Sequence, residues 1–157
     1  MNELQLRAIG PTLGSLLLLL GALGFEYVGG LAPCHLCILQ RWPHGIAVVL
    51  GLFILVWPRR WLALVAGLVV LDGAGTGLYH VGVERGWWQG PTTCTAATPG
   101  SMAPGELLDQ ILATPVVLCD QVAWSMLGIS MAGWNVILSL GIAWLWVRAY
   151  ASSSASQ

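Results

Sequence analysis

Four cysteines are the residues of this chain whose type and spacing could carry out chemistry. Cys34 and Cys37 form a Cys-x-x-Cys pair directly after Pro33, and Cys94 and Cys119 lie far along the chain. A two-residue gap closes too small a loop to add much stability, so the first pair is better explained as redox-active than as structural. Four cysteines allow three pairings, of which Cys34–Cys37 with Cys94–Cys119 needs the least rearrangement.

An arginine stands four residues after the second cysteine of the first pair. If Pro33 begins a helix, Cys34 lies in its first turn, where the helix dipole favours a thiolate. Cys37 and Arg41 then lie on one helix face, and His44 is placed to share that face. We expect redox chemistry and no metal, because the other two cysteines are too widely separated to favour the alternative of a zinc site.

Composition places these cysteines in a membrane protein. The 157-residue chain is 57% hydrophobic and only 8% charged, with six arginines, no lysine and seven acidic residues. Soluble domains carry about 25% charged residues. There is no basic cluster, so nothing in the composition favours nucleic-acid binding.

Four apolar stretches are long enough to cross a bilayer, which takes about 20 residues. The sequence therefore predicts an all-α, four-transmembrane-helix bundle of up-down-up-down topology. The expected helices cover about residues 8–27, 36–57, 61–81 and 122–147. The expected single domain covers residues 1–150, and its two outer loops cover about 28–35 and 82–121. Residues 151–157 are expected to form a disordered Ser/Ala tail. A cleaved signal peptide is the alternative for the first stretch, and we favour a retained helix.

The arginines predict which side of the membrane each loop faces. Most arginines lie at the end of the bundle that carries both termini, and the positive-inside bias puts that end in the cytoplasm. The cysteine-bearing loops then face the oxidising side of a bacterial envelope or of a secretory compartment. Glu26, at the outer end of the first helix, is expected to be solvated. The segment 107–112 is predicted to form a short amphipathic helix in the second loop.

Polar and small residues inside the apolar stretches are further candidates. A carboxylate near the middle of the membrane is costly, so Asp72 is a functional candidate, and the only partners that the sequence offers are polar groups of other helices such as Asn135. Gly73, Gly75 and Gly77 are expected to allow close packing of helices.

The order of the helices and cysteines is itself specific. Pro33-Cys34-x-x-Cys37 precedes the second helix, Arg41 follows, and a second cysteine pair lies in the second outer loop. This order resembles the DsbB family of bacterial inner-membrane disulfide-generating proteins. The segment 86–91 (Gly-Trp-Trp-Gln-Gly-Pro) looks like the shorter-looped members, as do Cys119-Asp120, Trp124 and Gly128-Ile129-Ser130. The resemblance covers nearly the whole chain except the tail.

The resemblance implies a protein-disulfide oxidoreductase of the bacterial inner membrane, with cytoplasmic termini and periplasmic cysteine loops. A reduced DsbA-like thioredoxin-fold oxidant would attack Cys94 of a Cys94–Cys119 disulfide, and Cys119 would then attack Cys34. Cys37 would pass electrons to a quinone, ubiquinone or menaquinone, held by Arg41. Two further candidates to line the quinone pocket are His80 and His44.

Two other readings remain open at this point. A vitamin-K-epoxide-reductase-like protein has a similar four-helix core, but its loop cysteines precede the Cys-x-x-Cys pair, whereas here they follow it. A non-enzymatic membrane scaffold clipped by disulfides is the alternative of a different class. The position of Cys34 and Cys37 at the membrane edge, beside Arg41, argues against the scaffold.

Overall fold

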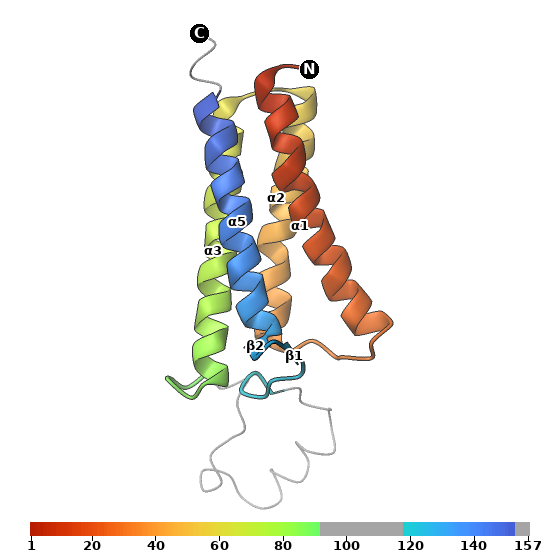
Figure 1. The fold of residues 1–157 in the computed structure, drawn as a ribbon, viewed down its shortest axis with the longest axis vertical. Helices are drawn as coiled ribbons and strands as arrows, with labels where there is room; N and C mark the ends of the chain where they lie inside the picture. Colours follow the sequence, from red (N-terminus) through yellow and green to blue (C-terminus); the bar gives the residue numbers. More distant parts are fainter. Residues whose placement is uncertain (92–117, 153–157) are drawn as a thin grey trace, which may run out of the picture.

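Four long helices make up most of the chain that the computed structural model describes, which is residues 1–91 and 118–152. All four are long and apolar enough to cross a membrane. They lie side by side with alternating direction, and both termini are at the same end of the bundle (Figure 1). The predicted all-α, four-helix transmembrane bundle is confirmed. The helices are α1 (Glu3–Tyr27), α2 (His35–Val56), α3 (Arg60–Glu84) and α5 (Met131–Ser152).

Three of these helices extend beyond the apolar stretches that predicted them. α1 begins at Glu3 rather than near residue 8, because Asn2 and Gln5 form a capping box. The Asn2 side chain accepts from the Gln5 amide at 2.9 Å, and the Gln5 side chain accepts from the Asn2 amide at 2.8 Å. α3 continues to Glu84, and α5 includes Ala151 and Ser152, which the prediction had assigned to the tail.

The fourth transmembrane helix begins at Met131, and the prediction that it starts near residue 122 is wrong. The residues before it form a short antiparallel hairpin at the end of the bundle opposite the start of α1 (Figure 1). Leu127 and Gly128 form its turn with φ angles of 56° and 77°, and a helix cannot continue through two left-handed residues. An uncharged composition does not distinguish this hairpin from a helix. Its strands are β1 (Ser125–Met126) and β2 (Ile129–Ser130).

Small residues allow α3 to pack closely against α2 and α5. A Cβ atom on Gly73 would lie 3.0 Å from Pro43, and one on Gly77 would lie 2.9 Å from Val136. These contacts confirm the predicted packing role of both glycines. Gly75 has nothing within 4 Å of the position of a Cβ atom, so the same prediction is wrong for it.

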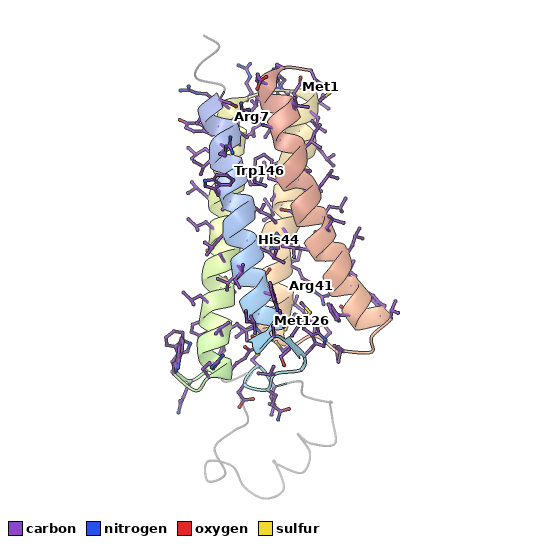
Figure 2. All side chains as sticks on the ribbon, viewed as in Figure 1. Met1, Arg7, Arg41, His44, Met126 and Trp146 are labelled. Carbon is purple, nitrogen blue, oxygen red and sulfur yellow. The ribbon has the colours of Figure 1, made fainter. Side chains whose placement is uncertain are left out.

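Two buried clusters stabilise the bundle. The larger one occupies the end that carries the termini and includes Trp146, Ile54 and Val70, all fully buried (Figure 2). The smaller one lies at the opposite end and contains cysteines. The predicted helix at 107–112, Cys94 with its disulfide, and the tail after Ser152 lie outside the described residues.

Candidate functional site

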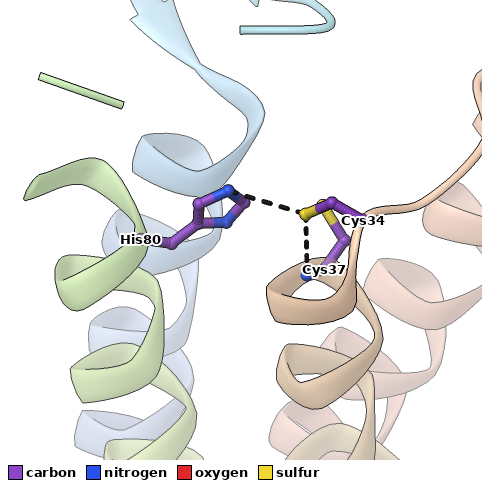
Figure 3. A group of neighbouring side chains, drawn as sticks. All are labelled: Cys34, Cys37 and His80. Atoms are coloured by element: carbon purple, nitrogen blue, oxygen red, sulfur yellow. Dashed lines mark hydrogen bonds between the residues drawn. The ribbon is translucent and has the colours of Figure 1, made fainter. Parts of the chain in front are cut away.

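The Cys-x-x-Cys pair lies where α2 begins. Cys34 is the N-cap residue of α2, and its Sγ accepts a hydrogen bond from the Cys37 amide at 3.2 Å (Figure 3). The two sulfur atoms are 2.8 Å apart, and both residues are free thiols in this structure. The disulfide between them stays a prediction for the oxidised protein.

Cys34 is buried, with only 4% of its surface exposed. The hydrogen bond between its thiol and the Cys37 sulfur, together with burial, raises the pKa of Cys34 above its ordinary value. The Cys37 backbone amide acts in the opposite direction and is outweighed. The predicted effect of the helix N-terminus is present, but it does not decide the protonation of Cys34, because the neighbouring sulfur and burial dominate.

We expect Cys34 of the reduced protein to remain a thiol in mildly alkaline solution. Iodoacetamide reacts only with thiolates, so alkylation of Cys34 should begin at a higher pH than for a free cysteine, whose pKa is about 8.5. Cys37→Ala removes the largest cause of the raised pKa and should move the onset to lower pH. Mass spectrometry of the alkylated fraction across pH measures this. An identical onset in both proteins would show that Cys37 does not raise the pKa of Cys34.

Cys119 lies against this pair although it is distant in sequence. It is fully buried and belongs to the same cluster as Cys34, with Cys37 packed against the cluster. The Cys119 carbonyl oxygen is 3.2 Å from the Nε2 atom of His80. Three of the four predicted catalytic cysteines therefore meet at the N-terminal end of α2, while Cys94 lies outside the described residues.

His80 reaches this cluster from α3. Its ring points toward Cys34, and its Nε2 atom is 3.7 Å from the Cys34 Sγ (Figure 3). Its Nδ1 atom is 2.9 Å from the Gln40 side-chain nitrogen, and Nε2 is 4.0 Å from a Glu84 carboxylate oxygen. The Glu84 side chain is only 6% exposed. His80 thus contacts the thiol site directly, and sequence reasoning missed Gln40 and Glu84.

The ligand atoms of Cys34, Cys37 and His80 all lie within 4.8 Å of one another, which is close enough to hold a metal ion. A metal would need an unprotonated Nε2 on His80. That nitrogen faces the Cys119 carbonyl, which only accepts hydrogen bonds, so it must carry a proton. The hydrogen bonding of His80 therefore argues against zinc at this site.

Arg41 is held by α1 rather than free beside Cys37. Its guanidinium forms an ion pair with Glu26 and donates to the Ala22 carbonyl at 3.5 Å. The Arg41 and Glu26 side chains are each 22% exposed. The expectation that Glu26 is a solvated helix end is wrong, because the pair links the C-terminal end of α1 to α2 (Figure 2).

A cavity of about 420 Å³ opens between α1, α2 and α5. All four predicted site residues of the membrane region line it: Cys37, Arg41, His44 and His80. The rest of its lining is mostly apolar and includes Leu17, Phe25, Trp124, Met126 and Leu138. A chamber with an apolar wall and a few polar groups is typical of a site for a small, largely apolar molecule.

His44 belongs to a polar group inside the bundle. Its Nε2 atom is 3.2 Å from both the Asn135 side-chain oxygen and the Ser139 hydroxyl. Asn135 also donates to Gln40 at 2.8 Å, so its predicted pairing with Asp72 is wrong, and Asp72 is exposed. Sequence reasoning missed these contacts. The sequence does carry one indication of them, which is the presence of two amides and a hydroxyl (Gln40, Asn135 and Ser139) in otherwise apolar helices.

The chain is similar to known proteins over most of its length. Residues 7–149 match the family model described as disulfide bond formation protein DsbB. A disulfide bond formation protein B of Stutzerimonas stutzeri is 33% identical over 142 residues, covering 83% of this chain and 85% of that protein. A protein of the same name from Dechloromonas aromatica is 33% identical over 159 residues, covering 90% of each chain.

A third relative named disulfide bond formation protein B, from Alkalilimnicola ehrlichii, is 34% identical over 146 residues, covering 81% of this chain and 82% of that protein. No solved structure gives a significant match. The family match includes parts or all of the four helices. It also includes Cys94 and the three cysteines that the structure brings together. The chain therefore belongs to the DsbB family of disulfide bond formation proteins.

Proposed function

We propose that this protein reoxidises a periplasmic DsbA-like dithiol and passes the electrons to a membrane quinone. The observation that carries the proposal is the position of the Cys34–Cys37 pair between two partners. Cys119, from the outer loop, packs against Cys34, whereas Cys37 lines the membrane-level cavity. A sulfur pair in this position can exchange with a protein thiol on one side and with a lipid-soluble acceptor on the other.

The cavity residues fit a quinone ring. The wall is largely apolar, and Arg41 and His44 supply polar groups along one side of α2. His44 Nδ1 is buried and has no hydrogen-bond partner among the described residues, so it can pair with a bound molecule. A quinone held there would supply an acceptor for the two electrons of the Cys34–Cys37 dithiol, together with two protons.

We expect the thiol chemistry to run as a series of thiol–disulfide exchanges. A partner thiolate attacks Cys94, and the Cys94–Cys119 bond breaks to free Cys119. Cys119 then attacks Cys34, which forms a Cys34–Cys119 bond and releases Cys37 as a thiolate. The second partner thiol releases Cys94, which attacks Cys119 and re-forms their disulfide. The partner leaves oxidised, and Cys34 and Cys37 hold its two electrons.

The burial of Cys34 supports this direction of attack. In disulfide exchange, the sulfur whose thiol has the lower pKa leaves more readily. Burial makes a thiolate on Cys34 unfavourable, so Cys34 is the poorer leaving group. An incoming Cys119 thiolate should therefore bond to Cys34 and expel Cys37.

The proposed setting is the bacterial inner membrane with both termini in the cytoplasm and the cysteines in the periplasm. The distribution of arginines between the two ends supports this orientation. Arg7 lies near one end of the bundle, and Arg41 lies toward the opposite end (Figure 2). Arg41 is paired with Glu26 and adds no free positive charge to the outer end.

Turnover of the purified full-length protein in lipid nanodiscs tests the proposal. We expect one reduced partner dithiol to be oxidised for each quinone reduced. Thiol titration measures the partner, and absorbance measures the quinone. Parallel assays with short-chain ubiquinone and menaquinone identify the acceptor. Cys37→Ala should stop both signals. Partner oxidation without quinone reduction, or neither reaction, would overturn the proposed function.

A further inference from the structure

Gln40 stands at the centre of a hydrogen-bonded chain that joins three helices. Its side-chain nitrogen donates to the Leu36 carbonyl at 3.1 Å and lies 2.9 Å from His80 Nδ1. Its oxygen accepts from the Asn135 side-chain nitrogen at 2.8 Å. Gln40 is only 6% exposed, and these bonds use both of its amide hydrogens and its oxygen.

The partners of Gln40 fix the orientation of its amide. The Leu36 carbonyl can only accept, so the Gln40 nitrogen faces it and the Gln40 oxygen faces the Asn135 amino group. The opposite orientation would place oxygen against oxygen and nitrogen against nitrogen. Space is also tight, since a Cβ atom on Gly77 would lie 3.2 Å from both the Gln40 oxygen and the Asn135 nitrogen.

The orientation of Gln40 in turn fixes the tautomer of His80. Because Gln40 donates to Nδ1, that nitrogen carries a lone pair, and the proton of the neutral ring is on Nε2. Nε2 faces the Cys119 carbonyl at 3.2 Å, an acceptor that requires the same tautomer. It is also 3.7 Å from the Cys34 sulfur (Figure 3). The contacts of Gln40 and of the Cys119 carbonyl, on opposite sides of the ring, therefore both place the proton on Nε2.

We propose that Gln40 and His80 are positioning residues that hold Cys119 beside Cys34 for disulfide exchange. The inference rests on the proposed function, in which a Cys34–Cys119 bond forms and breaks. The His80 Nε2–H anchors the backbone of Cys119. Both ring nitrogens are engaged by protein groups, so His80 serves the thiol exchange rather than hydrogen bonding to a quinone.

The same N–H group assists the exchange at the sulfur. When Cys119 attacks, the Cys34–Cys119 bond forms, the Cys34–Cys37 bond breaks, and the electron pair stays on the Cys37 sulfur. When the Cys34–Cys119 bond later breaks, the electron pair goes to Cys34, whose burial disfavours a thiolate. His80 Nε2–H is placed to donate to that sulfur and so stabilises the thiolate as it leaves.

An equilibrium measurement tests the positioning without partner or quinone. Full-length protein carrying Cys37→Ala and Cys94→Ala keeps only Cys34 and Cys119. Titration of their disulfide against glutathione gives the effective concentration of one thiol at the other. Adding Gln40→Met should lower this concentration about tenfold, because one buried hydrogen bond no longer fixes the ring.

Gln5→Met is the matched control, since it is the same substitution at an amide whose nitrogen donates to the Leu55 carbonyl at 2.8 Å. This amide lies at the far end of the bundle, and its loss should leave the effective concentration unchanged. Asn135→Ala is a second route to the same effect. It leaves Gln40 and His80 in place but frees the Gln40 amide to turn, and should give an intermediate value.

The tautomer provides an independent readout. Nitrogen-15 spectra of the wild-type protein should show His80 with a protonated Nε2 and an unprotonated Nδ1, and Gln40→Met should populate both tautomers. A proton on Nδ1 in the wild type would overturn the inference, as would equal effective concentrations in Gln40→Met and Gln5→Met. Absence of quinone-dependent turnover in the wild type would instead refute the proposed function and leave these measurements interpretable.

Discussion

Replacing Cys119 with serine should lower oxidation of the protein partner about a thousandfold or more, while a small dithiol still drives slow quinone reduction. Cys34 is 4% exposed, so the active-site sulfur of a folded partner cannot approach it directly. Cys119 packs against Cys34 in the same buried cluster and is the sulfur placed to transfer the exchange. Cys37 is only partly buried, which leaves a path for a small reagent.

The measurement compares two electron donors on one protein. Quinone reduction is followed with the reduced DsbA-like partner and with dithiothreitol, for the wild type and for Cys119→Ser. Because dithiothreitol bypasses the outer loop, its rate controls for damage to the Cys34–Cys37 pair or to the cavity. Unchanged turnover with the protein partner would mean that Cys119 has only a structural role. Loss of both rates would point to a collapsed site instead.

The architecture of the bundle could be predicted because it depends on the hydrophobicity of each stretch of the chain taken by itself. Each apolar stretch has to satisfy its own backbone in lipid, so length and composition are enough to predict a spanning helix. The start of the fourth helix at Met131 depends instead on two left-handed residues, Leu127 and Gly128. Leucine rarely adopts that conformation, and the residues around it are as apolar as a helix, so hydropathy carries no signal for the turn.

The site could be predicted where its geometry is local and not where it is tertiary. The spacing of Cys37, Arg41 and His44 puts them on one face of α2, and all three line the cavity. The partners of Gln40 on α3 and α5 depend on how the helices rotate against one another. No spacing along the chain specifies that Asn135 meets Gln40 rather than Asp72.

The environment of the thiols also depends on tertiary contacts. The helix dipole at Cys34 is a local property, and the Cys37 amide does donate to its sulfur. Burial of Cys34 comes from Cys119 and Val83, which reach it from elsewhere in the chain. The same holds for Arg41, since its charge could be predicted but its ion pair with Glu26 could not.

Replacing Arg41 with methionine should weaken quinone binding about 10- to 100-fold, which is the effect of losing one charge-assisted hydrogen bond. Arg41 lines the cavity together with Cys37, and a cation there favours the negative charge that an acceptor gains with electrons. Lysine should give an intermediate value, because it keeps the charge and loses the planar set of donors. Calorimetric titration of a short-chain quinone into each variant measures the dissociation constant.

The ion pair with Glu26 makes a double variant the decisive control. Arg41→Met alone leaves the Glu26 carboxylate unpaired. Removing one partner of a fully buried pair costs about 3–5 kcal/mol, and we expect about 1–2 kcal/mol here because each side chain is 22% exposed. Adding Glu26→Gln removes the unpaired charge, so the double variant should recover the thermal stability of the wild type.

Quinone affinity then separates the two roles of Arg41. The Arg41–Glu26 pair and the neutral residues of the double variant have the same net charge. If Arg41 acts only by cancelling the charge of Glu26 or by holding α1 to α2, the double variant should bind quinone like the wild type. We expect it to regain stability and still bind quinone at least about tenfold more weakly, because it lacks the guanidinium donors. Wild-type affinity in the double variant would show that Arg41 is a structural tie between the two helices and not a quinone ligand.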